Sequence, residues 1–446
     1  MLVLVGCGSP GAASPSPSLA SATPGGTPSA TVSGSSTQEP AASATAAPSP
    51  APDAMLLRTM AAGLRLRADA GVDADVIATL PAGATVSVLD GPTASDGMAW
   101  YHVRFGDEVG WIAAGEEGEW LTRVANGRIG FACPNCGDDA GPATMTAQPD
   151  GTDMTVLYPR LTRITWSPDG SRVALEEADA NTGRSELLLM AADGSDVQSL
   201  GSGSGPAWSP DGERFAYVDQ AAEALLLIDG DRDPLGLTVT DVGVPGSLAW
   251  SPDGSRLAFI AIDCPECPPG EPIVGEPPMS VFVFEPPGGA VIKVADGGWG
   301  GHLRWLPDGS GLTFVEYDFG SGALELRVVD LESGAVRILA EGDEIGYGHA
   351  FSPDAGRVVT GTANGIVVFN ADGSDPRTVV PATAQANPMP QNPRWSPDGQ
   401  WVLYDMVWVT GDAIETWVIR SDGTGATRVA ELGNDASWQP VLEPLP

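Results

Sequence analysis

The stretch Trp166-Ser167-Pro168-Asp169-Gly170 decides how this chain folds, because close copies of it recur five more times. The copies run over 208–212, 250–254, 305–309, 351–356 and 395–399, so successive copies start 42 to 55 residues apart. Within a copy, the order Ser, Pro, Asp, Gly has the composition of a type I turn, since Pro presets φ and Gly can turn left-handed. Self-similarity at this period is typical of a repeat architecture.

The residues around each turn predict four strands per repeat. A short run ends in the aromatic residue, as in 161–166, and a strand of alternating polarity follows the turn, as in 172–175. An apolar run (187–190) then leads into a second turn at Asp193-Gly194, and a last short strand covers 197–200. Alternation at a two-residue period indicates strands. Four strands in roughly 45 residues form a β-propeller blade, so the predicted fold class is all-β.

The two ends of the repeat region predict how the ring closes. Strand 128–131 matches the second strand of a blade but has no turn motif before it, and 436–440 looks like a first strand with nothing after it. Three strands from one end and one from the other would complete a blade and remove exposed edges. With six whole units, this closure predicts seven blades over 125–446. The repeats resemble those of the TolB family over roughly 128–440, and six blades, as in that family, remain the alternative.

A different pattern precedes the propeller, over residues 55–124. Leu64-Arg65-Leu66-Arg67, a Leu80-Pro81-Ala82-Gly83 turn, Trp100-Tyr101-His102-Val103-Arg104 and Gly110-Trp111-Ile112 follow one another. Short strands in this order predict a small barrel. The segment resembles the bacterial SH3-like family, which implies binding of peptidoglycan or peptides, with Trp100, Tyr101 and Trp111 as candidate ligand-binding residues. The alternative is that these aromatic residues form the barrel core.

The N-terminal segment differs from both. Leu4-Val5-Gly6-Cys7 resembles the lipobox of bacterial lipoproteins, which implies lipid attachment at Cys7 and an extracytoplasmic protein anchored to the bacterial cell membrane. Residues 1–7 lack the basic and most of the apolar part of a signal peptide, so we expect the true start to lie upstream. Residues 8–54 are almost wholly Ser, Pro, Ala, Thr and Gly, a composition that predicts a disordered linker.

The charge of the chain excludes some partners. Lys and Arg number 22 against 58 Asp and Glu, which gives a net charge of −36. Nucleic-acid binding needs clustered cations that neutralise phosphates, and docking on anionic lipids needs the same. We therefore expect no nucleic acid, and membrane contact through the lipid anchor alone.

The loops opposite the tight turns are the candidate binding face of the propeller. Both turns of a unit fall on one face, so the longer loops (262–280, 295–302, 341–349 and 380–393) fall on the other. Long loops on a rigid scaffold are the usual carriers of binding function. The ligand-binding candidates on this face are Trp299, His302, Tyr347 and His349. The alternative is that these loops are ordinary solvated loops.

Four cysteines form two pairs, Cys133 with Cys136 and Cys264 with Cys267. Cys-Pro-x-Cys twice is the pattern of a zinc knuckle, and four thiolates would satisfy zinc. The pairs belong to units far apart in the ring, however, and an oxidising setting favours two local disulfides. Disulfides are therefore preferred, no metal or cofactor is expected, and shared zinc or free thiols stay as alternatives.

The sequence predicts a binding protein rather than an enzyme. It has three histidines and no Gly-x-Ser-x-Gly elbow for nucleophilic catalysis. We expect the barrel to contact cell wall or peptide, and the propeller to bind a cell-envelope protein or glycan. The alternative is an extracytoplasmic enzyme that cleaves a glycan or lactone at the loop face.

Overall fold

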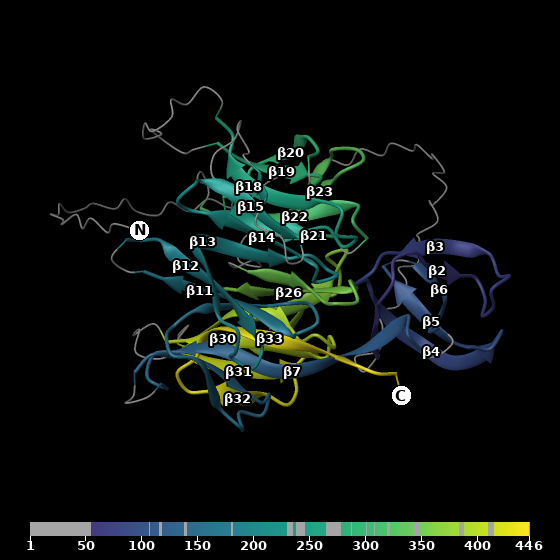
Figure 1. The fold of residues 1–446 in the computed structure, drawn as a ribbon, viewed down its shortest axis with the longest axis horizontal. Helices are drawn as coiled ribbons and strands as arrows, with labels where there is room; N and C mark the ends of the chain where they lie inside the picture. The colour runs from purple at the N-terminus through teal and green to yellow at the C-terminus, as the bar shows by residue number, and fades with distance from the viewer. Residues whose placement is uncertain are drawn as a thin grey trace, which may run out of the picture. The chain divides into compact units, whose positions relative to one another are not determined.

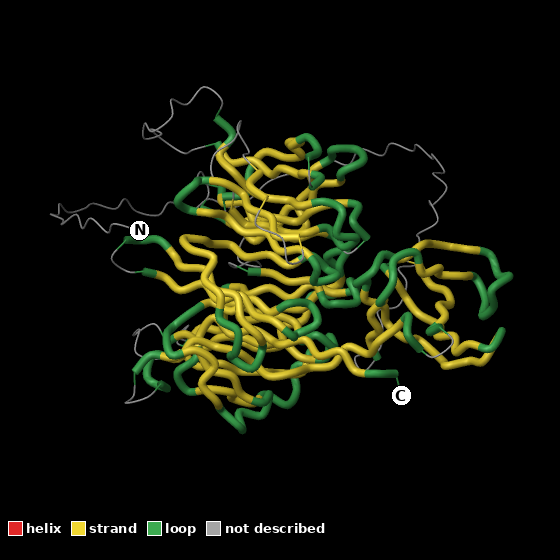
Figure 2. Tube along the Cα trace, in the orientation of Figure 1, coloured by secondary structure: helices red, strands yellow, loops and turns green. Residues whose placement is uncertain are grey.

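The computed structural model describes residues 55–106, 108–115, 118–137, 141–179, 182–229, 235–237, 246–264, 278–286, 288–299, 301–306, 308–318, 322–341, 348–382, 388–408 and 414–445. Across these ranges the regular structure consists of strands alone (Figures 1 and 2). The prediction of an all-β chain is confirmed. The predicted lipid site at Cys7 and the linker 8–54 lie outside the described residues.

The first seven strands form a small sheet around a core of its own. Their bounds are β1 Leu56–Thr59, β2 Leu64–Arg67, β3 Val76–Leu80, β4 Thr85–Ser95, β5 Met98–Phe105, β6 Glu108–Ala113 and β7 Leu121–Cys133. They pair in the order β3-β2-β6-β5-β4-β1-β7. Leu66, Tyr101 and Ile112 are among the buried residues of one apolar cluster inside this sheet. We call residues 55–124 the barrel.

Strand β7 continues from the barrel into the propeller. Its first half pairs with β1, and its second half pairs with β8 (Ala143–Ala147), which pairs in turn with β9 (Thr155–Tyr158). The last strand of the chain, β33 (Asn434–Glu443), pairs antiparallel with β7 from Arg123 to Ala132. One strand from the C-terminal side therefore joins three from the N-terminal side, and this pairing ties the two ends of the described chain together.

The other strands form antiparallel sheets in chain order. Their bounds are β10 Arg163–Trp166, β11 Arg172–Ala178, β12 Ser185–Ala191, β13 Gln198–Trp208, β14 Arg214–Asp219, β15 Ala224–Asp229, β16 Leu235–Leu237, β17 Gly246–Trp250, β18 Leu257–Ile262, β19 Met279–Phe284, β20 Val291–Asp296, β21 Gly301–Trp305, β22 Gly311–Tyr317, β23 Leu324–Asp330, β24 Val336–Glu341, β25 His349–Phe351, β26 Arg357–Thr362, β27 Gly365–Asn370, β28 Arg377–Pro381, β29 Met389–Trp395, β30 Trp401–Val407, β31 Ile414–Arg420 and β32 Thr427–Ala430. Strands β17–β20, β21–β24, β25–β28 and β29–β32 are separate four-stranded sheets. Strand β13 pairs with β12 through its first half and with β14 through its second, so it belongs to two successive units. This is a propeller arrangement.

The repeated motif is the tight turn between the first two strands of a unit. In the first copy, Gly170 N–H donates to Ser167 O at 2.9 Å, and Gly170 has a φ of 70°, which favours glycine. Asp169 Oδ1 accepts from Ser167 Oγ at 2.5 Å and from Ser171 N–H at 3.1 Å. The side chain of Asp169 thus replaces backbone partners inside the turn, as Asp commonly does.

The residues on either side of the turn join each unit to the next. Trp250 Nε1–H donates to Ala207 O at 3.1 Å, in the preceding unit. Arg256, after the turn, donates to Gly309 O at 3.0 Å in the following unit and lies 4.6 Å from the ring centroid of Trp305. The same stacking joins Arg172 to Trp208, Arg214 to Trp250 and Arg357 to Trp395 at 4.7 Å each. The motif therefore also builds the contacts between units.

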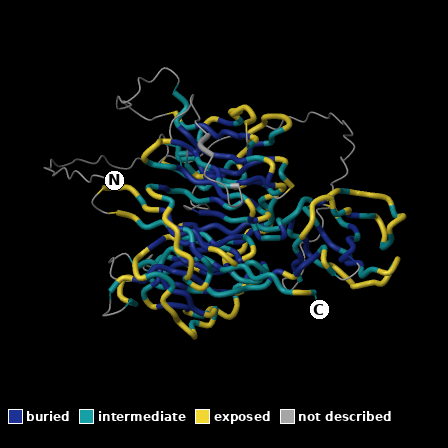
Figure 3. Tube along the Cα trace, viewed as in Figure 1, coloured by how far each residue is buried: buried dark blue, intermediate teal, exposed yellow. Residues whose placement is uncertain are grey.

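Apolar side chains fill the space between neighbouring sheets. One cluster combines Phe259 and Phe282 of one unit with Val218 and Leu227 of the preceding one, and another combines residues of β18 and β19 with residues of β21 and β22. Buried residues follow the strands, whereas exposed ones lie mostly in turns and at sheet edges (Figure 3). This pattern is expected for sheets packed face to face.

Candidate functional site

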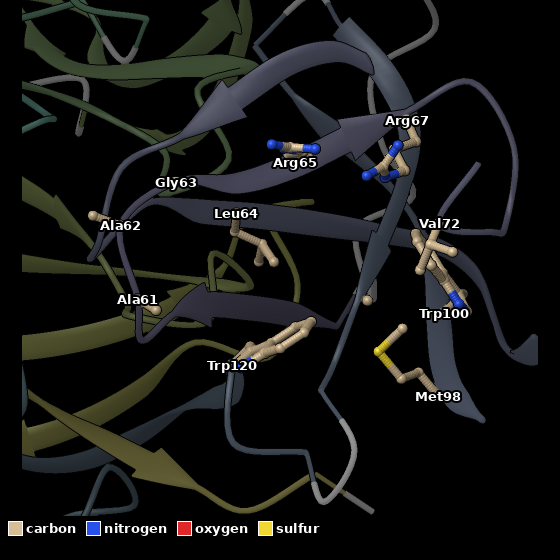
Figure 4. A pocket seen from close by; sticks show the side chains of 11 residues that line it. Ala61, Ala62, Gly63, Leu64, Arg65, Arg67, Val72, Met98, Trp100 and Trp120 are labelled. Atoms are coloured by element: carbon tan, nitrogen blue, oxygen red, sulfur yellow. The ribbon is translucent and has the colours of Figure 1, made fainter. Parts of the chain in front are cut away.

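The barrel contains a pocket of about 370 Å³. Residues from three parts of the barrel line it: Ala61, Ala62, Gly63, Leu64, Arg65, Arg67, Val72, Met98, Trp100, Ala113 and Trp120. Figure 4 shows Leu64 and Trp120 on one part of the pocket wall, and Val72, Met98 and Trp100 close together on another. Arg65 and Arg67 lie along the upper side of the pocket in this view. An apolar concavity with a few polar groups at its edge is the usual form of a ligand site.

The two arginines give this pocket its positive charge. Arg67 Nη1–H donates to Ala74 O at 2.6 Å, which holds its guanidinium in place. Arg65 is exposed, and among the described residues its side chain makes no hydrogen bond or ion pair. A free guanidinium beside apolar and aromatic surface suits a ligand that carries both a carboxylate and apolar groups.

The three aromatic residues predicted for the barrel do not share one surface. Trp100 forms part of the pocket wall and donates from Nε1 to Ser95 O at 3.1 Å, but only 2% of it is exposed. Tyr101 is 1% exposed and packs in the barrel core, so no ligand reaches it in this conformation. Trp111 lies outside the pocket and stacks on His102, with ring centroids 4.9 Å apart. Adjacent residues of a strand point to opposite faces, which separates Trp100 from Tyr101.

A second polar site lies on the first strands of the propeller units, which include β13, β17, β21, β25, β29 and β33. We call them the inner strands. Five of these strands carry a bulge three residues before their tryptophan, and the bulged residue has a left-handed φ of 50° to 63°. The bulged residues are Gly205, Ser247, His302, Asn392 and Asp435. Left-handed backbone is unfavourable for most side chains, and strained residues of this kind concentrate at functional sites.

Two of the predicted histidines meet at these strands. His302 lies in β21, and its Cε1 would be 3.8 Å from a Cβ at Gly348, the residue before His349 at the start of β25. His349 is 2% exposed, and its Nε2 lies 3.0 Å from Thr313 Oγ1, whereas its Nδ1 has no partner among the described residues. The sequence placed both histidines at one face, and the structure makes them neighbours.

Two arginines accompany the histidines. Arg304 and Arg394 precede Trp305 and Trp395, and the residues at this position in the other units are small: Thr165, Ala207, Ala249, Ala350 and Ser437. Arg304 Nη1–H donates to Leu303 O at 2.8 Å, and Arg394 Nη1–H donates to Ala436 O. Arg304 is exposed to solvent. Burial by the surrounding strands and the nearby Arg394 both act to lower the pKa of its guanidinium.

The charges of this cluster shift the pKa values of its weaker acids and bases. Burial, together with the positive charges of Arg304 and Arg394, lowers the pKa of His302 to about 4. Burial, Arg304 and His302 lower the pKa of His349 as well. Both histidines are therefore neutral at pH 7 and can donate or accept one hydrogen bond each.

One buried carboxyl group faces the same cluster. Asp405 is 2% exposed, its Oδ2 accepts from Asn392 Nδ2–H at 3.2 Å, and its Oδ1 has no partner among the described residues. Burial raises the pKa of Asp405 to about 6, although Arg394 and Asn392 act in the opposite direction. Nearby, Arg163 Nε lies 3.8 Å from Asp435 Oδ2. Arg304, Arg394 and Asp405 were not predicted; the signal for the arginines was the departure from small residues before the tryptophan.

Two other residues were predicted for the loop face, Trp299 and Tyr347. The backbone N–H of Trp299 donates to Glu316 Oε2 at 3.4 Å. Tyr347 lies outside the described residues.

Cys133 ends strand β7, and Cys264 follows the end of strand β18. A disulfide joins Cys133 and Cys136 directly after β7. Cys264, two residues after β18, is also disulfide-bonded, and Cys267 lies outside the described residues. Within the described part of the chain, no three or more His, Cys, Asp and Glu side chains group as metal ligands would.

The barrel can now be placed among known domains. Residues 62–131 match the family model described as Bacterial SH3 domain. The match begins before β2 and ends inside β7, so it covers most of the barrel and the start of the strand that enters the propeller. A search of curated proteins found no match.

Solved structures with a similar fold include two TolB structures and an enzyme. TolB from Acinetobacter baumannii is 15% identical, with 78% of this chain and 81% of that chain covered and a TM-score of 0.42. Putative TolB from Agrobacterium tumefaciens is 16% identical, with 59% and 99% covered and a TM-score of 0.43. Oligogalacturonate lyase in complex with manganese is 16% identical, with 66% and 97% covered and a TM-score of 0.38. The propeller assignment rests on the strand pairing described above.

Proposed function

We propose that this protein is an extracytoplasmic binding module of the bacterial cell envelope. In this proposal Cys7 carries a lipid anchor, residues 8–54 form a spacer, the barrel binds a peptide or glycan of the cell wall, and the propeller binds a second envelope partner. The observation that carries the proposal is the barrel pocket, where Trp120 and Leu64 provide apolar surface and Arg65 provides an exposed positive charge. The described residues contain no helix that could span a bilayer.

We also propose that the propeller has seven blades. The support is the order β33-β7-β8-β9, which adds a four-stranded unit made from both ends of the chain, and the division of β13 between two units. Together with β17–β32 these units would make a closed ring. An experimental structure with six blades would contradict this count.

The barrel proposal is tested by co-sedimentation of the purified protein with insoluble peptidoglycan. We expect the protein to pellet with the cell wall, and Trp120→Ala to reduce the pelleted fraction because it removes one side of the pocket. Trp111→Ala is the matched control, since Trp111 lies outside the pocket. Thermal melts confirm that both variants fold. Absence of pelleting, or equal loss in both variants, would contradict the assignment of this pocket.

The alternative function is an enzyme that acts at the inner strands of the propeller. Neutral His302 and the raised pKa of Asp405 favour it, because shifted acids and bases cluster at catalytic sites. We prefer a binding role because Thr313, the hydroxyl-bearing residue that contacts His349, is completely buried, so its hydroxyl is not available as a nucleophile. Turnover of a glycan or lactone that is lost in His302→Ala would reverse this preference.

A further inference from the structure

Within the described residues, the inner strands β21, β25 and β29 contain a positive charge without an ion-pair partner, in a protein of net charge −36. Arg304 makes no ion pair among the described residues; its one hydrogen bond there is to the adjacent Leu303 O. Arg394 faces Asp405, and Arg163 lies beside Asp435. These two arginines therefore have acidic neighbours, whereas no acidic group of the described chain pairs with Arg304.

The repeat itself shows that Arg304 is not needed to build a blade. Three units have Ala at the equivalent position, at Ala207, Ala249 and Ala350, and their inner strands pair as β21 does. The guanidinium of Arg304 is exposed and has a second guanidinium, that of Arg394, nearby, so it experiences repulsion and gains no ion pair within the described residues. The charge therefore contributes little to the fold, and a ligand with a negative charge would relieve the repulsion.

The surroundings of Arg304 match such a ligand in other ways. His302 and His349 are neutral and lie beside it, and the Nδ1 atom of His349 is buried with no partner in the described part of the chain. His302 also adopts a left-handed φ of 54°, an unusual conformation for histidine that a bulge holds in place. Ala350, on the strand between Arg304 and Arg394, is small where the equivalent residues of its neighbours have long side chains.

From these features we propose that Arg304, with His302, His349 and Arg394 around it, binds a single carboxylate group. The charge decides between anions: one unpaired guanidinium matches a monoanion, whereas a phosphate dianion would leave a negative charge near Asp405. Arginine binds carboxylates through two parallel hydrogen bonds, which suits a planar group. This inference deepens the proposed role of the propeller as a binding module and names the chemical class of its ligand. Such a carboxylate occurs on a sugar acid or at the end of a peptide.

The test is isothermal titration calorimetry on the purified chain at pH 7.5. The probes are sodium D-glucuronate for the sugar-acid source and N-acetyl-L-alanyl-L-alanine for the peptide source. D-glucose and the C-terminal amide of the dipeptide are the uncharged counterparts, and inorganic phosphate is the competing anion. We expect one carboxylate probe to bind saturably, and which of the two binds identifies the source.

Arg304→Ala is the decisive variant, because it restores the residue found in three other units. We expect it to weaken carboxylate binding roughly tenfold or more, the size of a charge-assisted contact. Arg337→Ala removes the same charge from the exposed strand β24 and should leave binding unchanged. If Arg304→Ala does not fold, Arg304→Gln, which keeps most of the side-chain length, gives the same test.

Three results would overturn the proposal: no binding of either carboxylate, equal binding by Arg304→Ala, or equal binding of the uncharged counterparts or of phosphate. Peptidoglycan co-sedimentation through the barrel is measured separately. Failure of the carboxylate proposal would therefore leave the barrel function standing, and failure of the barrel function would leave the carboxylate site testable.

Discussion

The two ends of the inner propeller strands differ in what is repeated from unit to unit. At the end that leads into the Ser-Pro-Asp-Gly turn, most units repeat a tryptophan, with Phe351 the exception, and its indole often contacts the preceding unit, as Trp250 contacts Ala207 and Trp305 contacts Ala249. At the bulge three residues earlier, the backbone conformation repeats but the side chain changes, from Ser247 to His302 to Asn392. The tryptophan position keeps its residue type in most units because the fold needs that contact. The bulge keeps its backbone conformation while its side chain changes, so the chemistry of the units can differ there.

The largest effect should come from removing a repeated tryptophan. Trp250 is 8% exposed, packs in an apolar cluster between two units and donates to Ala207 O. We expect Trp250→Ala to lower the free energy of unfolding by about 3–5 kcal/mol, as is typical for a buried large aromatic residue. Urea denaturation followed by far-UV circular dichroism measures this. Ser247→Ala, at the other end of the same strand, is the control. A loss below about 1 kcal/mol in Trp250→Ala would remove the distinction between the two ends.

Asp405, which accepts a hydrogen bond from the bulged residue Asn392, should make the free energy of unfolding depend on pH. The pKa of Asp405 is about 6 in the folded protein, above its ordinary value, because the group is buried among Asn392, Arg394 and Asp435. The folded state therefore binds the proton more tightly, so Asp405 costs stability above pH 6, and this cost disappears as the pH falls toward 4. Asp405→Asn should raise the free energy of unfolding at pH 7.5 by up to about 3 kcal/mol.

The comparison across pH isolates this effect. The advantage of Asp405→Asn should shrink as the pH falls from 7.5 to 4.5. Burial lowers the pKa of His302 to about 4, so His302 destabilises the fold progressively below pH 6.5 in both proteins and cancels in the difference. A difference that does not change with pH would show that Asp405 is not the titrating group.

Much of this fold was predictable because its essential contacts are local or repeated. The turn motif predicts its own hydrogen bonds, and the alternation after it predicts strands such as β11 and β14. The unpaired 128–131 and 436–440 segments predicted the pairing that β7 and β33 make. The register of the bulges was not predictable, since a bulge depends on both strands of a pair.

The candidate sites were less predictable than the fold. Tyr101 looked like a ligand-binding residue, yet it is in the barrel core, because which face of a strand points inward depends on the closed barrel. Trp120 follows the last barrel motif and gave no signal of its own, although it lines the pocket. In the sequence, Arg304 and Arg394 replace the small residues found at this position in the other units. Only the structure shows that these two arginines lie near each other.

Two arginines near Trp305 allow a direct comparison between a residue that the fold needs, Arg256, and one that we assign to ligand binding, Arg304. Arg256 stacks on Trp305 and donates to Gly309 O at 3.0 Å, so Arg256→Ala should cost about 1–3 kcal/mol through the lost hydrogen bond and cation–π contact. Arg304 makes no such contact between units, and its removal relieves repulsion from Arg394. Arg304→Ala should therefore change the ligand-free stability by less than about 0.5 kcal/mol. Urea melts of both variants test this, and equal losses would contradict it.

The smallest effect distinguishes internal junctions from the closing one. Trp250 Nε1–H has a carbonyl partner, whereas the Nε1 atoms of Trp166 and Trp438 are buried without one among the described residues. Trp166 and Trp438 lie where the two ends of the chain meet, so within the described residues the closing junction lacks the indole hydrogen bond that Trp250, Trp305 and Trp395 make. Trp250→Phe should lose about 1 kcal/mol more than Trp166→Phe, because removing an unpartnered N–H gives up no bond. Both changes delete a similar apolar area, so the difference between their urea midpoints reports the hydrogen bond alone. A larger loss in Trp166→Phe would mean that the closing junction contains a partner, such as a bound water, for the indole.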